Sequence, residues 1–328
     1  MKLIKKIKGL NDFHLCRGLE VLVYKDKMQF DGNEFEQKVR QYYYVEKDNL
    51  IKWMNDGKLR YLYNNGVFEE EKVKYFNPIY FAPNVYYSSK DEDGLFKYSF
   101  MENGTEYLFE IESEKSLSRI EYNPGNSVLM IPTSGDRQLL FYTKTGERLW
   151  VYEEEEVVKG TELEIVRFPS VVDDVVVIIS EIITESIRKA QGFNIRTGEK
   201  LWELRDDDSP NHLFEGDDKM LYGCLSIYDE LVLCRLDPFT GKFDKWAVKR
   251  DEGISVCPRN VTMHNNRLYY SSNRPGCEFG IIDCGKKELV ESVALGLKSG
   301  YQIGAPKISD GKAYVFSRFA GELRVYEL

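Results

Sequence analysis

The sequence predicts an all-β fold, a seven-bladed β-propeller built from four-stranded antiparallel blades. The first observation is a repeated pattern, because FYTKTGERLW at Phe141–Trp150 recurs as FNIRTGEKLW at Phe193–Trp202. The second is its spacing, since similar glycine-centred turns recur at intervals of about 40–50 residues, the period of propeller blades. The third is composition: 13% of the 328 residues are aromatic, and Tyr and Phe favour pleated, half-buried strands.

The glycine of each turn marks one predicted blade. Six turns fit this frame, at Gly57, Gly104, Gly146, Gly198, Gly241 and Gly285. Glycine supplies the positive φ of a tight hairpin, so each turn should join the third and fourth strands of a blade. A large side chain follows four or five positions later and should pack between neighbouring blades; these residues are Tyr61, Leu108, Trp150, Trp202 and Trp246. We interpret the tryptophans as structural residues rather than as ligand contacts.

The two ends of the chain should complete the last blade together. Residues Ala305–Leu328 supply three strands, and Lys2–Gly9 is the candidate for the missing outer strand. Closing the ring in this way would leave no free sheet edge, whereas a frayed basic tail is the alternative. The first blade, about residues 10–63, is oversized, and we interpret Lys25–Arg40 as an insertion in it. Using this segment for another blade would give the alternative count of eight. The whole of residues 1–328 is then one domain.

The form TGExLW, at Thr145–Trp150 and Thr197–Trp202, resembles the PQQ-like propeller repeat of the quinoprotein-like and WD-repeat-like superfamily. DPFTGKFDKW at Asp237–Trp246 is a stretched version of it. The resemblance implies the fold but not a function, because one fold supports many functions. Quinoprotein dehydrogenases of this family would have adjacent cysteines beside the cofactor and a longer chain. This sequence has neither, so we expect a non-enzymatic member without a cofactor.

Bulk properties disfavour several function classes. The net charge is −9, which argues against a general nucleic-acid-binding surface. The sequence contains no apolar run of membrane-spanning length, and lysines interrupt the N-terminal segment where a secretory signal would lie. We therefore expect a cytoplasmic monomer without a membrane partner. None of the six cysteines forms a CxxC pair, so a zinc cluster is not expected.

Few residues suit catalysis. The histidines are His14, His212 and His264, and no nucleophile elbow, P-loop or dinucleotide fingerprint occurs. His14 and Cys16 should share one face of an inner strand, His212 should lie near the mouth of the central channel, and His264 should lie in a solvated turn. An enzyme or small-ligand binder that uses the channel is the alternative function. A deep polar pocket near His212 or His14 would favour it.

Runs of acidic residues suggest where a partner binds. They are Glu69, Glu70 and Glu71; Asp91, Glu92 and Asp93; Glu153, Glu154, Glu155 and Glu156; and Asp206, Asp207 and Asp208. We place all four runs in loops on the rim opposite the glycine turns, where solubility alone is the plain alternative. A focused negative field attracts a basic protein partner. The hypothesis is a non-enzymatic binding platform for such a protein, and one version is an immunity protein that neutralises a basic toxin.

Overall fold

The computed structural model describes the chain apart from a set of short segments, and it describes only the backbone between residues 35 and 96. The segments outside the described residues are 17–18, 31, 37–40, 45–50, 56–58, 65–66, 73–76, 79–84, 93–94, 103–105, 114–120, 124, 133–137, 154–162, 166–168, 183–186, 206–211, 228–229, 249–255, 273–275 and 298–302. Among the described residues, no helix is long and apolar enough to cross a membrane.

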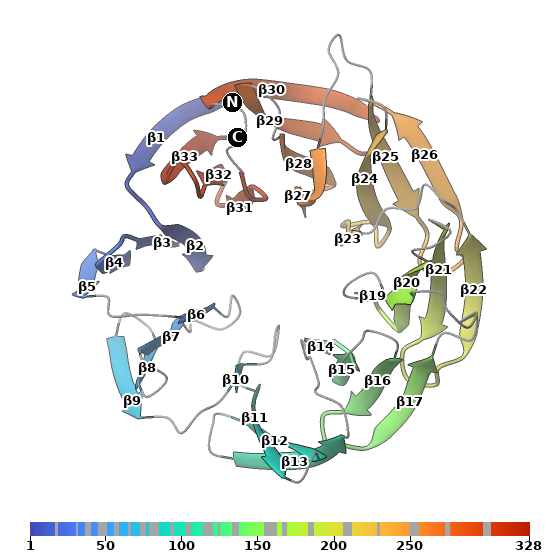
Figure 1. Cartoon of the computed structure of the whole chain (residues 1–328). Coiled ribbons are helices and arrows are strands. Elements are labelled where there is room, and N and C mark those ends of the chain that lie inside the picture. The colour runs from blue at the N-terminus through green and yellow to red at the C-terminus, as the bar shows by residue number, and fades with distance from the viewer. Residues whose placement is uncertain are drawn as a thin grey trace.

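Eight antiparallel sheets form a ring around a central opening (Figure 1). Numbered along the chain, the first four sheets contain these strands. Sheet 1 has β2 (Asp12–Cys16), β3 (Leu19–Val23), β4 (Lys27–Phe30) and β5 (Asn33–Glu36); sheet 2 has β6 (Gln41–Tyr44), β7 (Ile51–Asn55), β8 (Leu59–Asn64) and β9 (Val67–Lys72). Sheet 3 has β10 (Asn77–Pro78), β11 (Val85–Glu92), β12 (Leu95–Glu102) and β13 (Glu106–Ser113); sheet 4 has β14 (Glu121–Asn123), β15 (Val128–Pro132), β16 (Gln138–Thr143) and β17 (Arg148–Glu153).

The other four sheets continue the ring. Sheet 5 has β18 (Leu163–Ile165), β19 (Ser170–Val172), β20 (Val175–Ile182), β21 (Ile187–Asn194) and β22 (Lys200–Arg205); sheet 6 has β23 (Phe214–Glu215), β24 (Leu221–Ile227), β25 (Glu230–Leu236) and β26 (Phe243–Ala247). Sheet 7 has β27 (Val256–His264), β28 (Arg267–Ser272), β29 (Gly276–Asp283) and β30 (Glu288–Leu297); sheet 8 has β31 (Lys307–Ser309), β32 (Lys312–Ser317), β33 (Glu322–Glu327) and β1 (Lys2–Lys8). Within each sheet the strands run from the central opening outward in chain order, with β1 outermost in sheet 8 (Figure 1).

The predicted count of seven blades does not hold, because the described residues form eight sheets. The predicted first blade, about residues 10–63, is divided between sheets 1 and 2, and part of the supposed insertion Lys25–Arg40 forms β4 and β5. Gly57 lies outside the described residues, but in the sequence it falls between β7 and β8, the second and third strands of sheet 2, rather than between a third and a fourth strand. The alternative count of eight, which used the same segment, agrees with the strand pairing.

The N-terminal strand pairs with the last strand of the chain, as the sequence predicted. β1 is antiparallel to β33, with Lys2 opposite Glu327 and Lys8 opposite Glu322. Most side chains of β1 are exposed, so its hold on the sheet comes from backbone pairing and from ion pairs. Lys6 Nζ lies 3.1 Å from Glu322 Oε1, and the N-terminal amine pairs with Glu291 of sheet 7.

The apolar core lies between neighbouring sheets rather than inside one layer. One cluster joins sheets 4 and 5 through buried residues such as Phe141, Tyr152, Val176 and Ile195. Similar clusters join sheets 6 and 7, sheets 7 and 8, and sheets 8 and 1. Because each sheet buries both faces against its neighbours, the middle strands are apolar on both sides, as Val175–Ile179 is in β20.

An aromatic ring on the outer strand of one sheet packs against the turn glycine of the next sheet. Three contacts of this kind occur: Phe109 on Gly146, Trp150 on Gly198 and Trp202 on Gly241. A Cβ added at Gly198 would lie 2.7 Å from Trp150 Cδ2, closer than real Cβ contacts come. The indole of Trp150 also stacks on Phe141, with ring centroids 3.9 Å apart. The prediction that Trp150 and Trp202 pack between blades is confirmed, whereas Phe109 takes the role predicted for Leu108.

Hydrogen bonds fix two of these rings. Trp150 Nε1 donates to the Ile195 carbonyl at 2.8 Å, and Trp202 Nε1 donates to the Pro238 carbonyl at 2.7 Å. Each acceptor belongs to the turn of the next sheet, and each lies three residues before the turn glycine. Each copy of the TGExLW pattern therefore supplies both kinds of residue that this contact needs. Its tryptophan packs against the glycine of the next sheet, and its own glycine packs against the aromatic ring of the preceding sheet.

The turn between β29 and β30 departs from the predicted glycine anchor. The left-handed position belongs to Lys287, with φ of 61°, rather than to Gly285. The Lys287 amide donates to the Asp283 carbonyl at 2.8 Å, just as the Gly198 amide donates to the Asn194 carbonyl at 2.9 Å. Lys287 Nζ lies 4.6 Å from the ring centroid of Trp246, so a cation covers this tryptophan at the turn.

Candidate functional site: the acidic rims

The described parts of the four acidic runs lie at or near the ends of strands. Glu69–Glu71 fall within β9 rather than in the loop after it, which corrects the prediction for this run. Asp91 and Glu92 are the last residues of β11 rather than part of the loop after it, which corrects the prediction for these two residues, and Asp93 lies outside the described residues. Glu153 is exposed and ends β17. Glu154–Glu156 and Asp206–Asp208 follow β17 and β22 in the sequence but lie outside the described residues.

The order of the strands relates these runs to one another. In each sheet the second and fourth strands run parallel to each other, because neighbours in the sheet are antiparallel. β9, β17 and β22 are fourth strands, and β11 is a second strand. The glycine turns join third to fourth strands, so they lie at the other ends of these elements. We call the edge of the ring where the second and fourth strands end the "strand-end rim", and the opposite edge the "turn rim".

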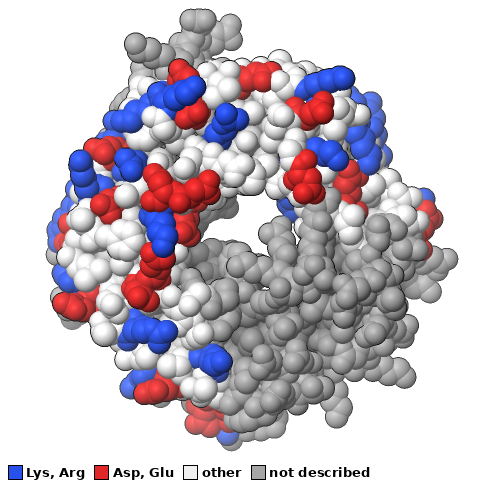
Figure 2. Space-filling view, turned by 180° about the vertical axis from the view of Figure 1, so that it is seen from behind, with Lys and Arg blue, Asp and Glu red and all other residues white. Residues whose placement is uncertain are grey.

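The turn rim carries acidic residues of its own, which the sequence analysis missed. Asp173 and Asp174 lie in the turn from β19 to β20, and Glu215, Asp217 and Asp218 lie around the turn from β23 to β24. All five are exposed, and we call them the "turn-rim cluster". On the face seen in Figure 2, acidic side chains gather beside the central opening, with basic side chains among them. The available signal was the pairing of Asp-Asp with a tight turn in VVDDV and EGDDK.

The turn-rim cluster is tied into the fold by polar contacts between sheets. Lys219 Nζ donates to both carboxylate oxygens of Asp173, at 2.6 and 2.7 Å. The Asp217 amide donates to Asn266 Oδ1 of sheet 7 at 2.8 Å. Within sheet 6, the Tyr222 hydroxyl donates to Asp218 Oδ2 at 2.9 Å. These contacts give the cluster a structural role in joining sheets 5, 6 and 7.

Nearby cations partly neutralise the negative charge of the turn-rim cluster. Burial raises the pKa of Glu215, and the negative charge of Asp173 raises it further. Hydrogen bonding to Asp173 raises the pKa of Lys219, so this cation stays charged over the physiological range. Burial and the Asp218 carboxylate raise the pKa of Tyr222, which keeps its hydroxyl protonated as a donor. Arg235 also lies 3.4 Å from Asp218 Oδ2, so the five acids gain two close cations but keep a net negative charge.

The histidines occupy separate places. His14 is half-buried on the inner strand β2, with Nε2 3.4 Å from Asp12 Oδ2. Burial opposes ionisation of Asp12, yet the hydrogen bond and charge of His14 outweigh it and lower the pKa of Asp12. His212 is half-buried two residues before the inner strand β23 and stacks on Phe214. His264 is exposed at the last residue of β27 rather than within a turn.

Metal-ligating side chains do not converge in the described part of the chain, where no group of three His, Cys, Asp or Glu residues could hold an ion. The side chain of Cys16 lies outside the described residues, so its predicted alignment with His14 stays a prediction. Cys224, Cys234, Cys277 and Cys284 are buried. Burial raises the pKa of Cys284 to about 12, which keeps this thiol protonated and unreactive.

Comparisons with known proteins identify the fold. No protein-family model and no curated protein matches the sequence. Among solved structures, BamB from Moraxella catarrhalis aligns with a TM-score of 0.58 and 12% identity, covering 99% of this chain and 97% of that one. Sqt1 from Saccharomyces cerevisiae aligns with a TM-score of 0.61 and 13% identity over 100% of both chains. Dihydro-heme d1 dehydrogenase NirN aligns with a TM-score of 0.56 and 10% identity over 100% of this chain and 77% of that one. These proteins are β-propellers, so the likeness shows that this chain has the β-propeller fold.

Proposed function

We propose that this protein is a non-enzymatic, cytoplasmic and monomeric binding platform of the PQQ-like repeat type, which recognises a basic protein through its strand-end rim. The observation that carries the proposal is the common direction of the four strands that hold or precede the acidic runs. Acidic residues gathered on one rim produce a negative potential that steers a basic partner towards that rim. In its narrower form, the proposal is an immunity protein that neutralises a basic toxin.

The structural neighbours share the fold with this chain, and one of them is a dehydrogenase, so the proposal depends on the loops of this chain rather than on the neighbours. A propeller without a catalytic centre can bind another macromolecule through its loops, and the proposed function of this chain is of that kind. The loops of a rigid ring can vary without loss of the scaffold, which is why binding residues concentrate there. The partner should carry a basic patch, and its binding should require no cofactor.

The test compares two charge reversals in the same sheet. Glu153 ends β17 at the strand-end rim, and Glu147 lies in the turn before β17 at the turn rim. Both side chains are exposed, so neither substitution should change folding by more than about 0.5 kcal/mol. A partner recovered by pull-down from the native organism is measured by stopped-flow association at several salt concentrations. Glu153→Lys should slow association, and Glu147→Lys should leave it nearly unchanged.

Salt supplies the second readout. Exposed charges are screened over about 8–10 Å at ordinary ionic strength, so the association rate should fall as salt rises. Reversal of all of Glu153–Glu156 to Lys should enlarge the effect of Glu153→Lys. The proposal is wrong if Glu147→Lys or Asp217→Lys slows association more than Glu153→Lys does, because the partner would then use the turn rim. It is also wrong if association does not depend on salt.

A further inference from the structure

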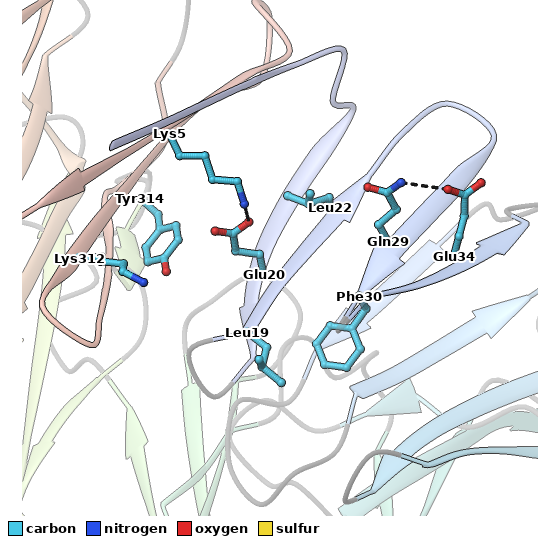
Figure 3. A pocket seen from close by; sticks show the side chains of 10 residues that line it. Lys5, Leu19, Glu20, Leu22, Gln29, Phe30, Glu34, Lys312 and Tyr314 are labelled. Carbon is cyan, nitrogen blue, oxygen red and sulfur yellow. Dashed lines mark hydrogen bonds and ion pairs between the residues drawn. The ribbon is translucent and has the colours of Figure 1, made fainter. Parts of the chain in front are cut away.

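A groove lies where the ring returns to its beginning, between sheets 8 and 1 (Figure 3). We call it the "seam groove", and its volume is ≈ 500 Å³. Its lining residues come from both sheets: Lys5, Lys312 and Tyr314 from sheet 8, and Leu19, Glu20, Leu22, Gln29, Phe30, Gly32 and Glu34 from sheet 1. Tyr314 and Phe30 are almost fully buried and form apolar walls, while Leu19 is 37% exposed.

The strand register shows which residue of sheet 8 corresponds to the aromatic rings of sheets 3, 4 and 5. Phe109, Trp150 and Trp202 share one position, opposite the residue that lies two places before the end of the third strand. In sheet 8 the third strand β33 ends at Glu327, and the corresponding residue is Val325, which lies opposite Lys5. Lys5 therefore stands where sheets 3, 4 and 5 carry an aromatic ring, a position that Lys245 and Glu291 take in sheets 6 and 7. Its ammonium group turns to Glu20 Oε2 at 2.5 Å, with about half of the side chain exposed.

The receiving side of the contact is present at this seam. Gly32 precedes the fourth strand of sheet 1 and has φ of +75°, similar to Gly198 with φ of +72°. A Cβ added at Gly32 would meet nothing within 4 Å, whereas one added at Gly146, Gly198 or Gly241 would strike a ring. Among the described residues, no ring covers Gly32. The seam groove thus has the glycine platform of the other contacts without the aromatic side chain.

The charges of the seam groove indicate what should accompany a ring. Glu20 is paired with Lys5, and Glu34 accepts hydrogen bonds from Lys27 and Gln29, both at 2.9 Å. Lys312 is exposed and has no ion pair among the described residues. A carboxylate entering the groove would therefore find one cation that the protein has not already neutralised. The apolar walls and this cation together select a ring next to a negative charge.

We propose that the seam groove binds an aromatic side chain of a partner protein, with a carboxylate beside it that pairs with Lys312. The ring takes the place that Trp150 and Trp202 fill at their own seams, and a ring carried on a peptide chain is the form that those contacts accommodate. This site lies on the turn rim, because Gly32 and Lys312 belong to turns on that side. It is separate from the strand-end rim, so either proposal can fail without the other.

The probe is a blocked tripeptide of alanine, tryptophan and aspartate, followed by amide chemical-shift changes in the ¹⁵N-labelled full chain. We expect saturable binding at millimolar concentration, with shifts confined to residues around the seam groove. Replacing the aspartate of the probe by alanine should weaken binding about fivefold, and Lys312→Ala should do the same. Replacing the tryptophan by alanine should abolish it. The proposal is overturned if the tryptophan peptide produces no saturable shifts at 10 mM, a concentration on the order of the dissociation constants of very weak complexes.

A filling variant tests the geometry by a different route. Lys5→Trp supplies the missing ring from the chain itself, so it should abolish peptide binding and raise the Tm by about 2 °C or more, because a buried indole replaces an exposed lysine. Lys2→Trp is the matched control, since it lies on the same strand opposite Glu327 and outside the groove. It should leave both peptide binding and Tm unchanged. Peptide binding that survives in Lys5→Trp, or a Tm that falls below that of Lys2→Trp, would show that the groove does not accept an indole.

Discussion

Replacement of Gly198 by alanine tests whether the contact between ring and glycine holds neighbouring sheets together. Two physical terms act at this position. The φ of +72° lies in the left-handed region, where an L-residue with a Cβ costs about 1–2 kcal/mol. The new Cβ would also lie 2.7, 2.8 and 2.9 Å from three carbons of the Trp150 indole, so the ring must shift. Overpacking of this kind costs about 1–3 kcal/mol, which gives about 2–5 kcal/mol in total.

Gly32→Ala separates the two terms. Gly32 has nearly the same φ, +75°, but its added Cβ meets nothing within 4 Å. It should therefore cost only the backbone term of about 1–2 kcal/mol. The difference between the two variants, about 1–3 kcal/mol, measures the collision with Trp150. In a Trp150→Ala background this difference should vanish, because coupling is confined to residues in contact.

The free energy of unfolding is measured by guanidinium titration, followed by far-ultraviolet circular dichroism because tryptophan fluorescence changes in the double variant. Equal costs for Gly198→Ala and Gly32→Ala, within about 0.5 kcal/mol, would refute the idea that the indole requires a glycine. An undiminished cost of Gly198→Ala in the Trp150→Ala background would refute it as well.

Four other outcomes follow from the same structure. Trp150→Ala should cost about 3–5 kcal/mol in denaturant titration, and a near-neutral result with loss of binding would indicate a recognition role instead. Deletion of Met1–Gly9 should lower the Tm sharply because it exposes the edge of β33, and an unchanged melting curve would contradict the pairing of β1. Lys287→Gly should be more stable than Lys287→Ala by about 1 kcal/mol, because both variants lose the cation over Trp246 but only glycine adopts the positive φ without strain. Equal unfolding midpoints of the two variants would argue against backbone strain at this position. Burial lowers the pKa of His212, so the folded state disfavours its protonation and the stability should fall as the pH drops through about 6.5. In a comparison of Tm between pH 8 and pH 5.5, His212→Gln should show a smaller fall in Tm than the unchanged protein. An identical fall in both proteins would contradict this expectation.

The sequence predicted most of the blade pattern where the repeat is strongest. The copies at Phe141–Trp150 and Phe193–Trp202 carry both the ring and the receiving glycine, and the structure uses both. Pairing of β1 with β33 also followed from simple strand arithmetic, because the last unit lacked one strand. These features join segments that are far apart in the sequence, and they could be predicted because the repeat shows where each copy and each strand recurs.

The blade count failed where the spacing shortens. Gly32 lies between the third and fourth strands of sheet 1, and Gly66, which is outside the described residues, falls between β8 and β9 in the sequence; they precede the next glycine of the series by 34 and 38 residues. Both intervals lie below the period of about 40–50 residues that was used to find blades. The turn of this blade was instead assigned to Gly57, which falls between β7 and β8 in the sequence.

Candidate sites were harder to predict than strands. The acidic runs were found by composition, but nothing in a run of glutamates tells a loop from an outer strand, so Glu69–Glu71 were misplaced. The turn-rim cluster depends on short turns of sheets 5 and 6 meeting in space, over contacts such as Lys219 with Asp173 that span 46 residues. The seam groove depends on a residue that is not there, namely an aromatic ring at the position of Lys5. Such a difference is visible only after the register of all sheets is known.

The contacts of Phe109, Trp150 and Trp202 all point the same way around the ring, each from one sheet to its successor. Sheets joined by such head-to-tail interfaces behave like the protomers of a cyclic oligomer, whose heterologous contacts close only when the rotations complete a full turn. A linear repeat array needs dedicated capping units at its ends. Here sheet 8 takes one strand from the beginning of the chain and three from its end, so the beginning and the end cap one another. Consequently, loss of the pairing between β1 and β33 would separate the two ends of the chain from one another and leave sheet 8 with an unpaired edge.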